Sequence, residues 1–313
     1  MKVDAFLEVA RRGSVTDAAR FLGYTPSGVS RMIESLEAQM GFALFVRSRH
    51  GMELTREGER LLPAMRELGH WHEQVNQLAS EIRGVVCGEI TVGSYFSLAC
   101  AWLPAILSEF GRRYPNVRVS VVEGDNAELA EGLSSRGVDL GLVSRRDAEA
   151  SGTSFRPLCV DQMVIWLPPH HELCAFEAIP IPELEGRPFV MPLPSTGNDV
   201  ESYFAAHGVS VDVRFASRDA ETIYGMVEAG LGLSMNNSLM TWRLRGDVEL
   251  RPLDPPYTIE LGIATPSREQ ESPAARCFAE VACEVVAGLC PTGSPELPGG
   301  GVPHQHPRAR ARE

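Results

Sequence analysis

The chain has 313 residues and a mass of 34.2 kDa, which is larger than one hydrophobic core usually supports and predicts two or three domains. Apolar residues make up 44% and charged residues 22% of the chain, which excludes a disordered or fibrous protein. No run approaches the roughly 18 apolar residues of a membrane span, and Glu8, Arg11 and Arg12 interrupt any signal-peptide core. We therefore expect a cytoplasmic protein that does not contact a membrane.

The formal net charge of −12 is unevenly distributed along the chain. Residues 1–60 hold nine basic and eight acidic residues, whereas the remaining 253 hold 20 basic and 33 acidic ones. An acidic body with an arginine-bearing, nearly neutral N-terminus permits a small nucleic-acid-binding domain joined to a larger domain of another purpose.

Cap and turn residues predict three short helices in the first forty residues. Gly13 ends the first helix, and Ser14 is a suitable N-cap for a second helix from Val15 to Leu22. Thr25 and Pro26 provide the cap and the first-turn proline of a third helix that reaches about Met40. Short strands at 44–47 and 52–55, joined by a turn at 50–51, would form a wing. The pattern predicts a winged helix-turn-helix; the alternative is a three-helix core without a nucleic-acid function.

Four segments of this region resemble the DNA-binding domain of LysR-type transcriptional regulators. They are GSVTDAARFL (13–22), SGVSRMIESLE (27–37), MGFALFVR (40–47) and LTREG (54–58). The resemblance implies that the third helix reads base edges and that the wing contacts phosphates, chemistry that suits helix N-termini, hydroxyls and arginines. The candidate DNA-binding residues are Thr25, Pro26, Ser27, Ser30, Arg31, Arg47 and Arg49. Many family members have glutamine where this chain has Pro26, so we expect a different half-site preference.

Residues 59–83 carry apolar side chains at spacings of three and four, close to a heptad repeat. Pro63 is expected to kink or restart this helix. A dimerising helix is favoured, as the resemblance also implies, over a helix packed only on its own chain. The candidate dimerisation residues are Leu61, Met65, Leu68, Trp71, Val75, Leu78 and Ile82.

Beyond residue 88, short β runs alternate with helical patterns, which predicts an α/β body with mostly parallel sheets. The segments 103–117, 123–133, 137–143 and 226–234 resemble the effector-binding half of the same family, two periplasmic-binding-protein-like lobes. The resemblance implies crossing strands near 158–168 and 256–266 and a ligand cleft between the lobes.

In such folds ligands lie beyond the carboxyl ends of strands, near helix N-termini. The candidate effector-binding residues are therefore Ser94, Tyr95, Phe96, Ser97, Asp125, Asn126, Pro194, Ser195, Thr196, Gly197, Ser217 and Asp219. Asp125 would repel an anionic effector unless it is paired, and Tyr95 and Phe96 suit a flat one. The segment 234–237 also departs from the hydrophobic stretch ending in proline that many relatives have. We expect a weakly charged, partly aromatic effector.

Two other functions are disfavoured by the sequence. An enzyme is disfavoured because the chain lacks a P-loop, G-x-S-x-G, H-E-x-x-H or G-x-G-x-x-G pattern, and because His170 and His171 follow two prolines in an expected loop. A redox sensor would use Cys159 and Cys174, but burial of Cys159 in a crossing strand is favoured. No cofactor is expected, and His304 and His306 are a weak basis for a metal site.

The sequence thus predicts an α plus α/β protein in four parts. These are a winged helix-turn-helix (1–58), a linker helix and hinge (59–88), a two-lobed effector-binding domain (89–290) and a disordered tail (291–313). Lobe I would comprise about 89–161 and 266–290, and lobe II about 162–265. The expected partners are double-stranded promoter DNA, a small-molecule effector, a second copy of the chain in a homodimer or homotetramer, and RNA polymerase if the protein activates transcription. The alternative is an effector-binding protein without a local regulatory output.

Overall fold

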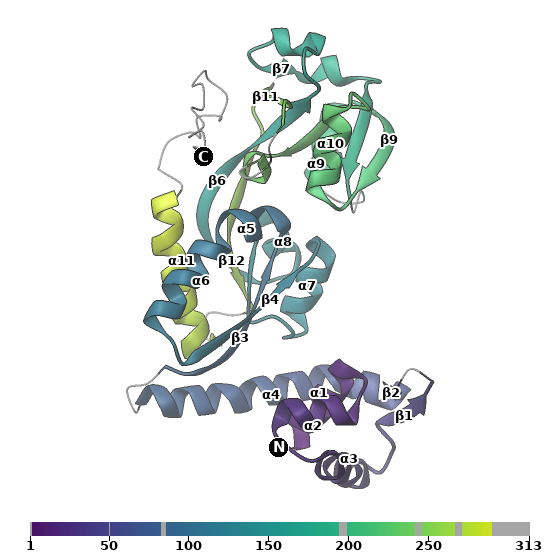
Figure 1. Cartoon of the computed structure of the whole chain (residues 1–313), viewed down its shortest axis with the longest axis vertical. Coiled ribbons are helices and arrows are strands. Elements are labelled where there is room, and N and C mark those ends of the chain that lie inside the picture. Colours follow the sequence, from purple (N-terminus) through teal and green to yellow (C-terminus); the bar gives the residue numbers. More distant parts are fainter. Residues whose placement is uncertain are drawn as a thin grey trace, which may run out of the picture.

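The computed structural model describes residues 2–49, 51–82, 86–193, 199–241, 244, 246–266 and 271–289. Three bodies follow one another along its long axis, with the N-terminal domain at one end and two lobes above it (Figure 1). A long helix runs across the underside of the middle body. The expected tail, together with His304, His306 and Cys290, lies outside the described residues.

The N-terminal domain folds as the cap residues predict. Ser14 Oγ accepts a hydrogen bond from Asp17 N, and Gly23 and Gly41 adopt the left-handed conformation at the helix ends. Phe6, Val29 and Ile33 lie in the core between the helices. The elements are α1 (Lys2–Arg12), α2 (Val15–Leu22), α3 (Pro26–Met40) and the antiparallel wing strands β1 (Phe45–Ser48) and β2 (Gly51–Leu54).

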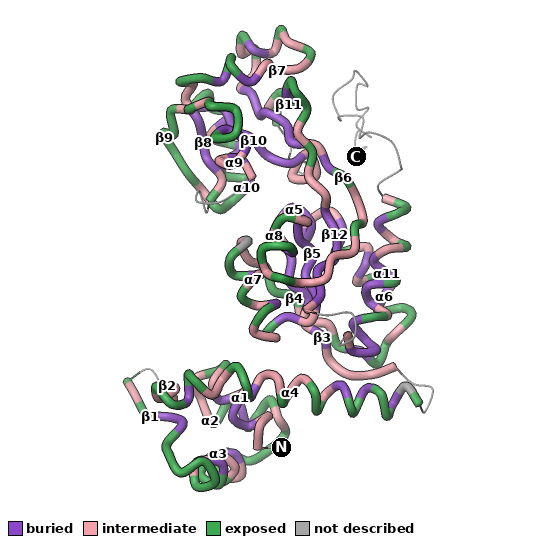
Figure 2. Tube along the Cα trace, turned by 180° about the vertical axis from the view of Figure 1, so that it is seen from behind, coloured by how far each residue is buried: buried purple, intermediate pink, exposed green. Residues whose placement is uncertain are grey.

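The linker helix α4 (Arg56–Ile82) begins three residues before the expected start. Thr55 explains the difference, because its hydroxyl accepts a hydrogen bond from Gly58 N at 3.0 Å. The helix continues through Pro63 instead of restarting there. Its C-terminal half lies beneath the middle body, where α4 contacts β3 and α11 (Figures 1 and 2).

One mixed sheet runs through both lobes in the order β4-β3-β5-β12-β6-β11-β7, with β10 also paired to β6. Strand β6 is 14 residues long; its first part pairs with β12, and Met163 to Leu167 pair with β10 and β11. Lobe I contains β3 (Gly88–Ser94), α5 (Phe96–Ala101), α6 (Leu103–Arg113), β4 (Val117–Glu123), α7 (Asn126–Ser134), β5 (Leu140–Ser144), α8 (Arg145–Ala150), part of β6 (Ser154–Leu167), β12 (Thr258–Thr265) and α11 (Pro273–Leu289).

Lobe II contains a second small sheet in which β8 and β9 are parallel. Its elements are η1 (Glu172–Ala175), β7 (Ile179–Pro180), η2 (Ile181–Leu184), β8 (Pro188–Pro192), α9 (Asp199–His207), β9 (Asp212–Ser217), α10 (Ala220–Glu228), β10 (Ser234–Asn237), η3 (Ser238–Thr241) and β11 (Glu249–Asp254). The lobe boundary expected at residue 265 is wrong, because β12 pairs antiparallel with β5 over Leu261 to Ala264 and therefore belongs to the sheet of lobe I.

Each lobe has its own apolar core. Trp102, Phe110 and Phe278 are fully buried between α6, α11 and the sheet of lobe I. In lobe II, Phe189 packs edge-to-face on Phe204 at a ring-centroid distance of 5.4 Å. Two separate cores joined by the crossing strands leave an interlobe space whose lining comes from both lobes.

Candidate functional site

The first turn of α3 presents polar groups outward. Thr25 Oγ1 accepts a hydrogen bond from Gly28 N at 3.1 Å, and Pro26 is the first helical residue, as expected. Val29 is buried, so the opposite face of the turn is exposed. The structure places Thr25, Pro26, Ser27 and Arg31 on this exposed face and Ser30 half-buried beside it.

The wing lies next to α3 and is held by a carboxylate that sequence reasoning missed. Glu37 Oε1 accepts hydrogen bonds from the backbone N–H groups of Leu44 at 2.7 Å and Phe45 at 3.2 Å. At the wing turn, Gly51 has a φ of 123°, and a Cβ there would lie 2.3 Å from Gly13 O. These contacts fix the orientation of the wing relative to the helices.

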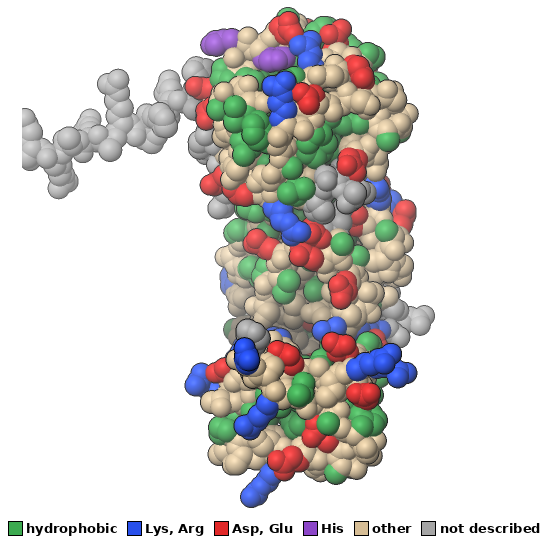
Figure 3. Space-filling view, turned by 90° about the vertical axis from the view of Figure 1, so that its right-hand side faces the viewer, with side chains coloured by type: hydrophobic (Ala, Val, Ile, Leu, Met, Phe, Trp, Pro, Cys, Tyr) green, Lys and Arg blue, Asp and Glu red, His purple; other side chains and the backbone are tan. Residues whose placement is uncertain are grey.

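Three arginines on this surface are available to a ligand. Arg31, Arg47 and Arg49 are exposed, and none of them forms an ion pair with another described residue. Figure 3 shows basic side chains projecting from this domain at the foot of the molecule, with acidic side chains among them. Unpaired guanidinium groups suit phosphates and the guanine edge.

The linker helix has the reverse of the usual amphipathic pattern over its C-terminal half. Three polar side chains, those of Gln74, Gln77 and Ser80, are buried on the side of lobe I, with Gln77 only 2% exposed, whereas Val75 is 62% exposed. The exposed apolar stripe consists of Leu68, Trp71, Val75, Leu78 and Ile82. Met65 and, in part, Leu61 pack instead in the core of the N-terminal domain, so the expectation that these two belong to a dimer seam is corrected.

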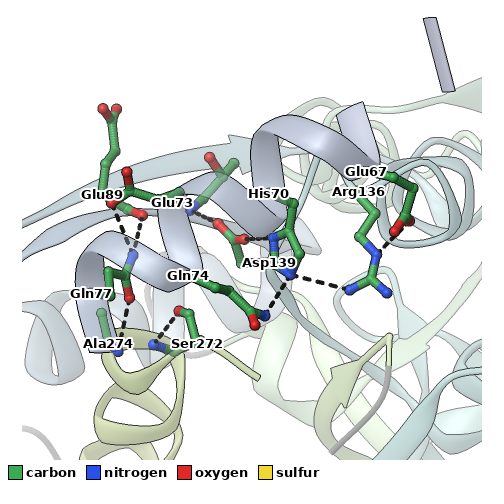
Figure 4. A network of polar contacts seen from close by, with 12 residues as sticks. Glu67, His70, Glu73, Gln74, Gln77, Glu89, Arg136, Asp139, Ser272 and Ala274 are labelled. Carbon is green, nitrogen blue, oxygen red and sulfur yellow. Dashed lines mark hydrogen bonds and ion pairs between the residues drawn. The ribbon is translucent and has the colours of Figure 1, made fainter. Parts of the chain in front are cut away.

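A polar network joins the buried face of α4 to lobe I (Figure 4). Arg136 Nε donates to Glu67 Oε1 at 2.7 Å, and its Nη1 lies 3.3 Å from His70 Nε2. His70 Nδ1 is 3.6 Å from Asp139 Oδ1, and Asp139 in turn accepts a hydrogen bond from Thr91 N. Because these partners are far apart in the sequence, spacing gave no signal for them.

A cavity of about 370 Å³ lies between the lobes. Of the expected residues, Tyr95, Phe96, Ser97 and Asp125 line it. Ser94 is buried outside the lining and donates to Tyr95 O, while Ser217 Oγ accepts from Asp219 N beside the start of α10. Asn126 is placed only by its backbone, as the first residue of α7, and Pro194, Ser195, Thr196 and Gly197 lie outside the described residues.

Several cavity residues were not among the candidates from the sequence, namely Glu123, Glu128, Asp147, Met163, Asp199, Arg218 and Met240. Met235, Asn236 and Asn237, from the segment 234–237 that departs from the family pattern, also line the cavity. Asp147 accepts hydrogen bonds from the hydroxyls of Tyr95 and Ser144. Burial, and then the charge of Asp147, raise the pKa of the Tyr95 hydroxyl well above its ordinary value, so Tyr95 remains a neutral donor to Asp147.

Two arginines form ion pairs across the cleft. Arg218 of lobe II lies 3.2 Å from Asp125 Oδ2 and 3.5 Å from Glu128 Oε1 of lobe I. Arg146 of lobe I donates to Asp199 Oδ1 of lobe II at 2.8 Å. Asp125 is therefore paired, and it also caps α7 in a capping box. Burial nevertheless raises the pKa of Asp199, against the opposing effect of its hydrogen bond with Arg146.

The two cysteines of the redox alternative lie in different lobes. Cys159 is in the part of β6 that pairs with β12, and Cys174 is in η1. Burial raises the pKa of the Cys174 thiol, which disfavours the thiolate that oxidants attack. Among the described residues there is no cluster of three or more potential metal ligands, and no described helix is long and apolar enough to cross a membrane.

These features define a class of protein in which a winged helix-turn-helix domain is joined by a long helix to a two-lobed ligand-binding domain. Residues 2–59 match the family described as bacterial regulatory helix-turn-helix protein, lysR family, and residues 83–287 match the LysR substrate binding domain. The chain belongs to the LysR family of transcriptional regulators. Members of this family regulate transcription and are not enzymes.

Similar proteins support the family assignment over nearly the whole chain. The HTH-type transcriptional regulator YvbU of Bacillus subtilis is 29% identical over 287 residues, which cover 91% of this chain and 97% of that one. Full-length OxyR C199D from Pseudomonas aeruginosa has a TM-score of 0.73 at 20% identity, covering 91% and 96% of the two chains. CbnR, solved in complex with its target DNA, has a TM-score of 0.60 at 18% identity, covering 91% and 98%. The two structures show a common fold.

Proposed function

We propose that this chain binds promoter DNA as a homodimer or homotetramer and responds to a small molecule held in the interlobe cavity. The observation that carries the proposal is the exposed N-terminal half of α3, where Ser27 and Arg31 are exposed, together with the exposed wing arginines Arg47 and Arg49. The protein would act in the cytoplasm, where promoter DNA lies, and RNA polymerase would be a further partner if it activates transcription.

The DNA contacts are assigned by chemistry. The hydroxyls of Ser27 and Ser30 and the guanidinium of Arg31 would enter the major groove, while Arg47 and Arg49 would bind phosphates on either side of it. Pro26 offers no side-chain hydrogen bond at the position where glutamine is common, so the preferred half-site would differ from the commonest one. CbnR, which has a similar fold, was solved in complex with its target DNA, which supports DNA binding by this fold.

The exposed apolar stripe of α4 would form the dimer seam. Five apolar side chains at heptad-like spacing remain exposed, while Gln74, Gln77 and Ser80 of the same helix are buried. Exposing such a stripe to water in a monomer is unfavourable, and a dimer would bury it. A two-fold dimer would place two α3 helices on a two-fold DNA site.

The effector would act by binding two arrangements of the assembly with different affinity, because a ligand with equal affinity for both shifts nothing. The cavity is bounded by both lobes and bridged by Arg218 and Arg146, so its occupancy and the relative position of the lobes are physically linked.

The test is a binding measurement of the purified protein with its own upstream intergenic DNA, over a salt series and against a scrambled competitor. We expect sequence-selective binding whose affinity falls linearly with salt on logarithmic axes. Binding no tighter than to the competitor contradicts local promoter recognition and favours the alternative of an effector-binding protein without a local regulatory output.

A further inference from the structure

The cavity between the lobes is lined by an excess of carboxylates. Its described lining holds five of them, from Glu123, Asp125, Glu128, Asp147 and Asp199, against the single guanidinium of Arg218. Arg146 adds a second positive charge beside the cavity through its contact with Asp199. Even with both arginines counted, three negative charges remain in excess. A cleft lined by one sign of charge attracts ligands of the opposite sign.

One residue of the cavity lining has a buried acceptor that lacks a donor. Asn236 lines the cavity and is only 2% exposed, and its Oδ1 has no hydrogen-bond partner among the described residues. The amide orientation follows from its neighbours. Ser234 Oγ donates its single hydrogen to Val190 O at 2.8 Å, so it accepts from Asn236 Nδ2 at 3.0 Å. The unpaired atom is therefore Oδ1 of Asn236, and a buried acceptor without a donor destabilises the folded state.

A large part of the remaining lining is apolar, beside the polar residues Ser97, Ser144 and Asn237. Phe96, Met163, Ile223 and Met235 contribute aromatic, thioether and aliphatic surface. The Tyr95 hydroxyl donates to Asp147, so it is not a free donor for an anionic ligand. The lining thus combines acceptors and negative charge with an apolar wall, and its one guanidinium is held by Asp125 and Glu128.

We propose that the cleft binds an organic cation, a small amine whose ammonium group donates to Asn236 Oδ1 and whose charge is balanced by the surrounding carboxylates. Its apolar part lies against Phe96 and the methionines, where the ring face also attracts a cation. This inference rests on the proposed function in taking the cleft as the effector site. The sequence predicted a weakly charged effector, and the proposal now specifies a positive charge.

The test compares ligands of similar shape and opposite charge with the full-length protein. Thermal unfolding and calorimetry are measured with 2-phenylethylamine against phenylacetate, and with butylamine and putrescine against butyrate and succinate, at millimolar concentrations and constant ionic strength. We expect at least one amine, and no carboxylate, to raise the Tm. Stabilisation by carboxylates without any by amines, or no stabilisation by any amine, overturns the proposal.

Variants locate the binding site of the stabilising amine. Glu123→Gln removes one cavity charge, and Glu131→Gln removes the same charge from an exposed position of α7 outside the lining. Asn236→Leu removes the orphaned acceptor and Asn236→Asp retains one. We expect a loss of affinity of about tenfold in Asn236→Leu, a smaller loss in Glu123→Gln, and unchanged affinity in Glu131→Gln. Amine binding that persists in Asn236→Leu and Glu123→Gln places the ligand elsewhere and overturns the proposal.

Asn236→Asp distinguishes a lost contact from a folding defect, because it keeps the oxygen acceptor at the same position. Retained amine binding in Asn236→Asp, with loss in Asn236→Leu, supports the proposal, and loss in both folded variants contradicts the role of the acceptor. The promoter-binding measurement is separate: selective DNA binding without any amine effect refutes the cationic ligand alone, whereas unselective DNA binding refutes the proposed function whatever the amines do.

Discussion

Arg136 Nε donates to Glu67 Oε1 at 2.7 Å, and this ion pair joins lobe I to the helix that carries the DNA-binding domain. The Arg136 side chain is 9% exposed, and its Nη1 also lies 3.3 Å from Nε2 of His70, one turn further along α4. A change in the position of lobe I therefore reaches α4 through a defined set of contacts and not only through the covalent hinge.

Arg136→Ala is expected to loosen this attachment. Arg136 has a φ of 57°, a left-handed conformation that is strained for alanine as it is for arginine, whereas glycine would relieve the strain. The alanine variant therefore measures the loss of the side-chain contacts alone. Because Glu67 is 45% exposed, water compensates it in part and the destabilisation should be about 1 kcal/mol or less. Hydrogen exchange should become faster in the C-terminal half of α4. Unchanged protection there, relative to an Arg112→Ala control on α6, contradicts the role of the ion pair.

The dimer seam gives a prediction about oligomeric state. Leu68→Asp combined with Val75→Asp introduces two charges into the exposed apolar stripe and should yield monomers, because unpaired charges are not tolerated in a helical seam. Sedimentation velocity measures the result. Asn76→Asp combined with Ala79→Asp introduces the same charges at exposed positions of α4 outside the stripe and should leave the oligomer intact. An unchanged sedimentation coefficient in the first variant refutes the seam.

The parts of the fold that were predictable from the sequence depend on local chemistry. Ser14, Thr25 and Gly23 act at helix ends within four residues of themselves, so their roles were predictable from spacing alone. The apolar stripe of α4 was equally visible as a heptad pattern. The prediction that Leu61 and Met65 belong to this stripe was wrong, because both side chains pack in the core of the N-terminal domain. The apolar period of α4 alone does not show which other helices its residues contact.

The cleft was less predictable because its charged residues meet only in three dimensions. Asp199 and Arg146 are 53 residues apart, and each stands in a helical segment that looks like an ordinary solvated surface. Nothing in the sequence around Glu37 indicates its role, although its carboxylate accepts a hydrogen bond from the backbone of Leu44 and so attaches the wing to α3. Asp125 was expected to line the cleft and to repel an anionic effector unless it is paired; in the structure it lines the cavity, pairs with Arg218 and also caps α7.

Alkaline pH tests the environment of Tyr257. Burial, and then the charge of Asp199, raise the pKa of this tyrosine to about 12. The raised value means that the folded state disfavours tyrosinate, so this contribution to stability is complete below pH 10 and is lost as the pH rises from 10 through 12. In an absorbance titration at alkaline pH, Tyr257→Phe should lack a late-ionising tyrosine that the wild type has. Identical late steps in the two proteins contradict the assignment.

Arg31 gives the most direct test of DNA reading. Arg31→Ala should weaken specific binding by roughly 1–3 kcal/mol if the guanidinium contacts a base or anchors the helix in the groove. Arg112→Ala removes the same charge from lobe I, far from α3, and should leave both the affinity and its salt dependence unchanged. If Arg31 contacts only phosphate, its loss should weaken binding to specific and scrambled DNA equally and reduce the salt slope by about one. If wild type and Arg31→Ala bind specific DNA with equal affinity, Arg31 does not lie in the interface. Arg31 is exposed and forms no ion pair with a described residue, so its removal should not change the fold in a way that hides a lost DNA contact.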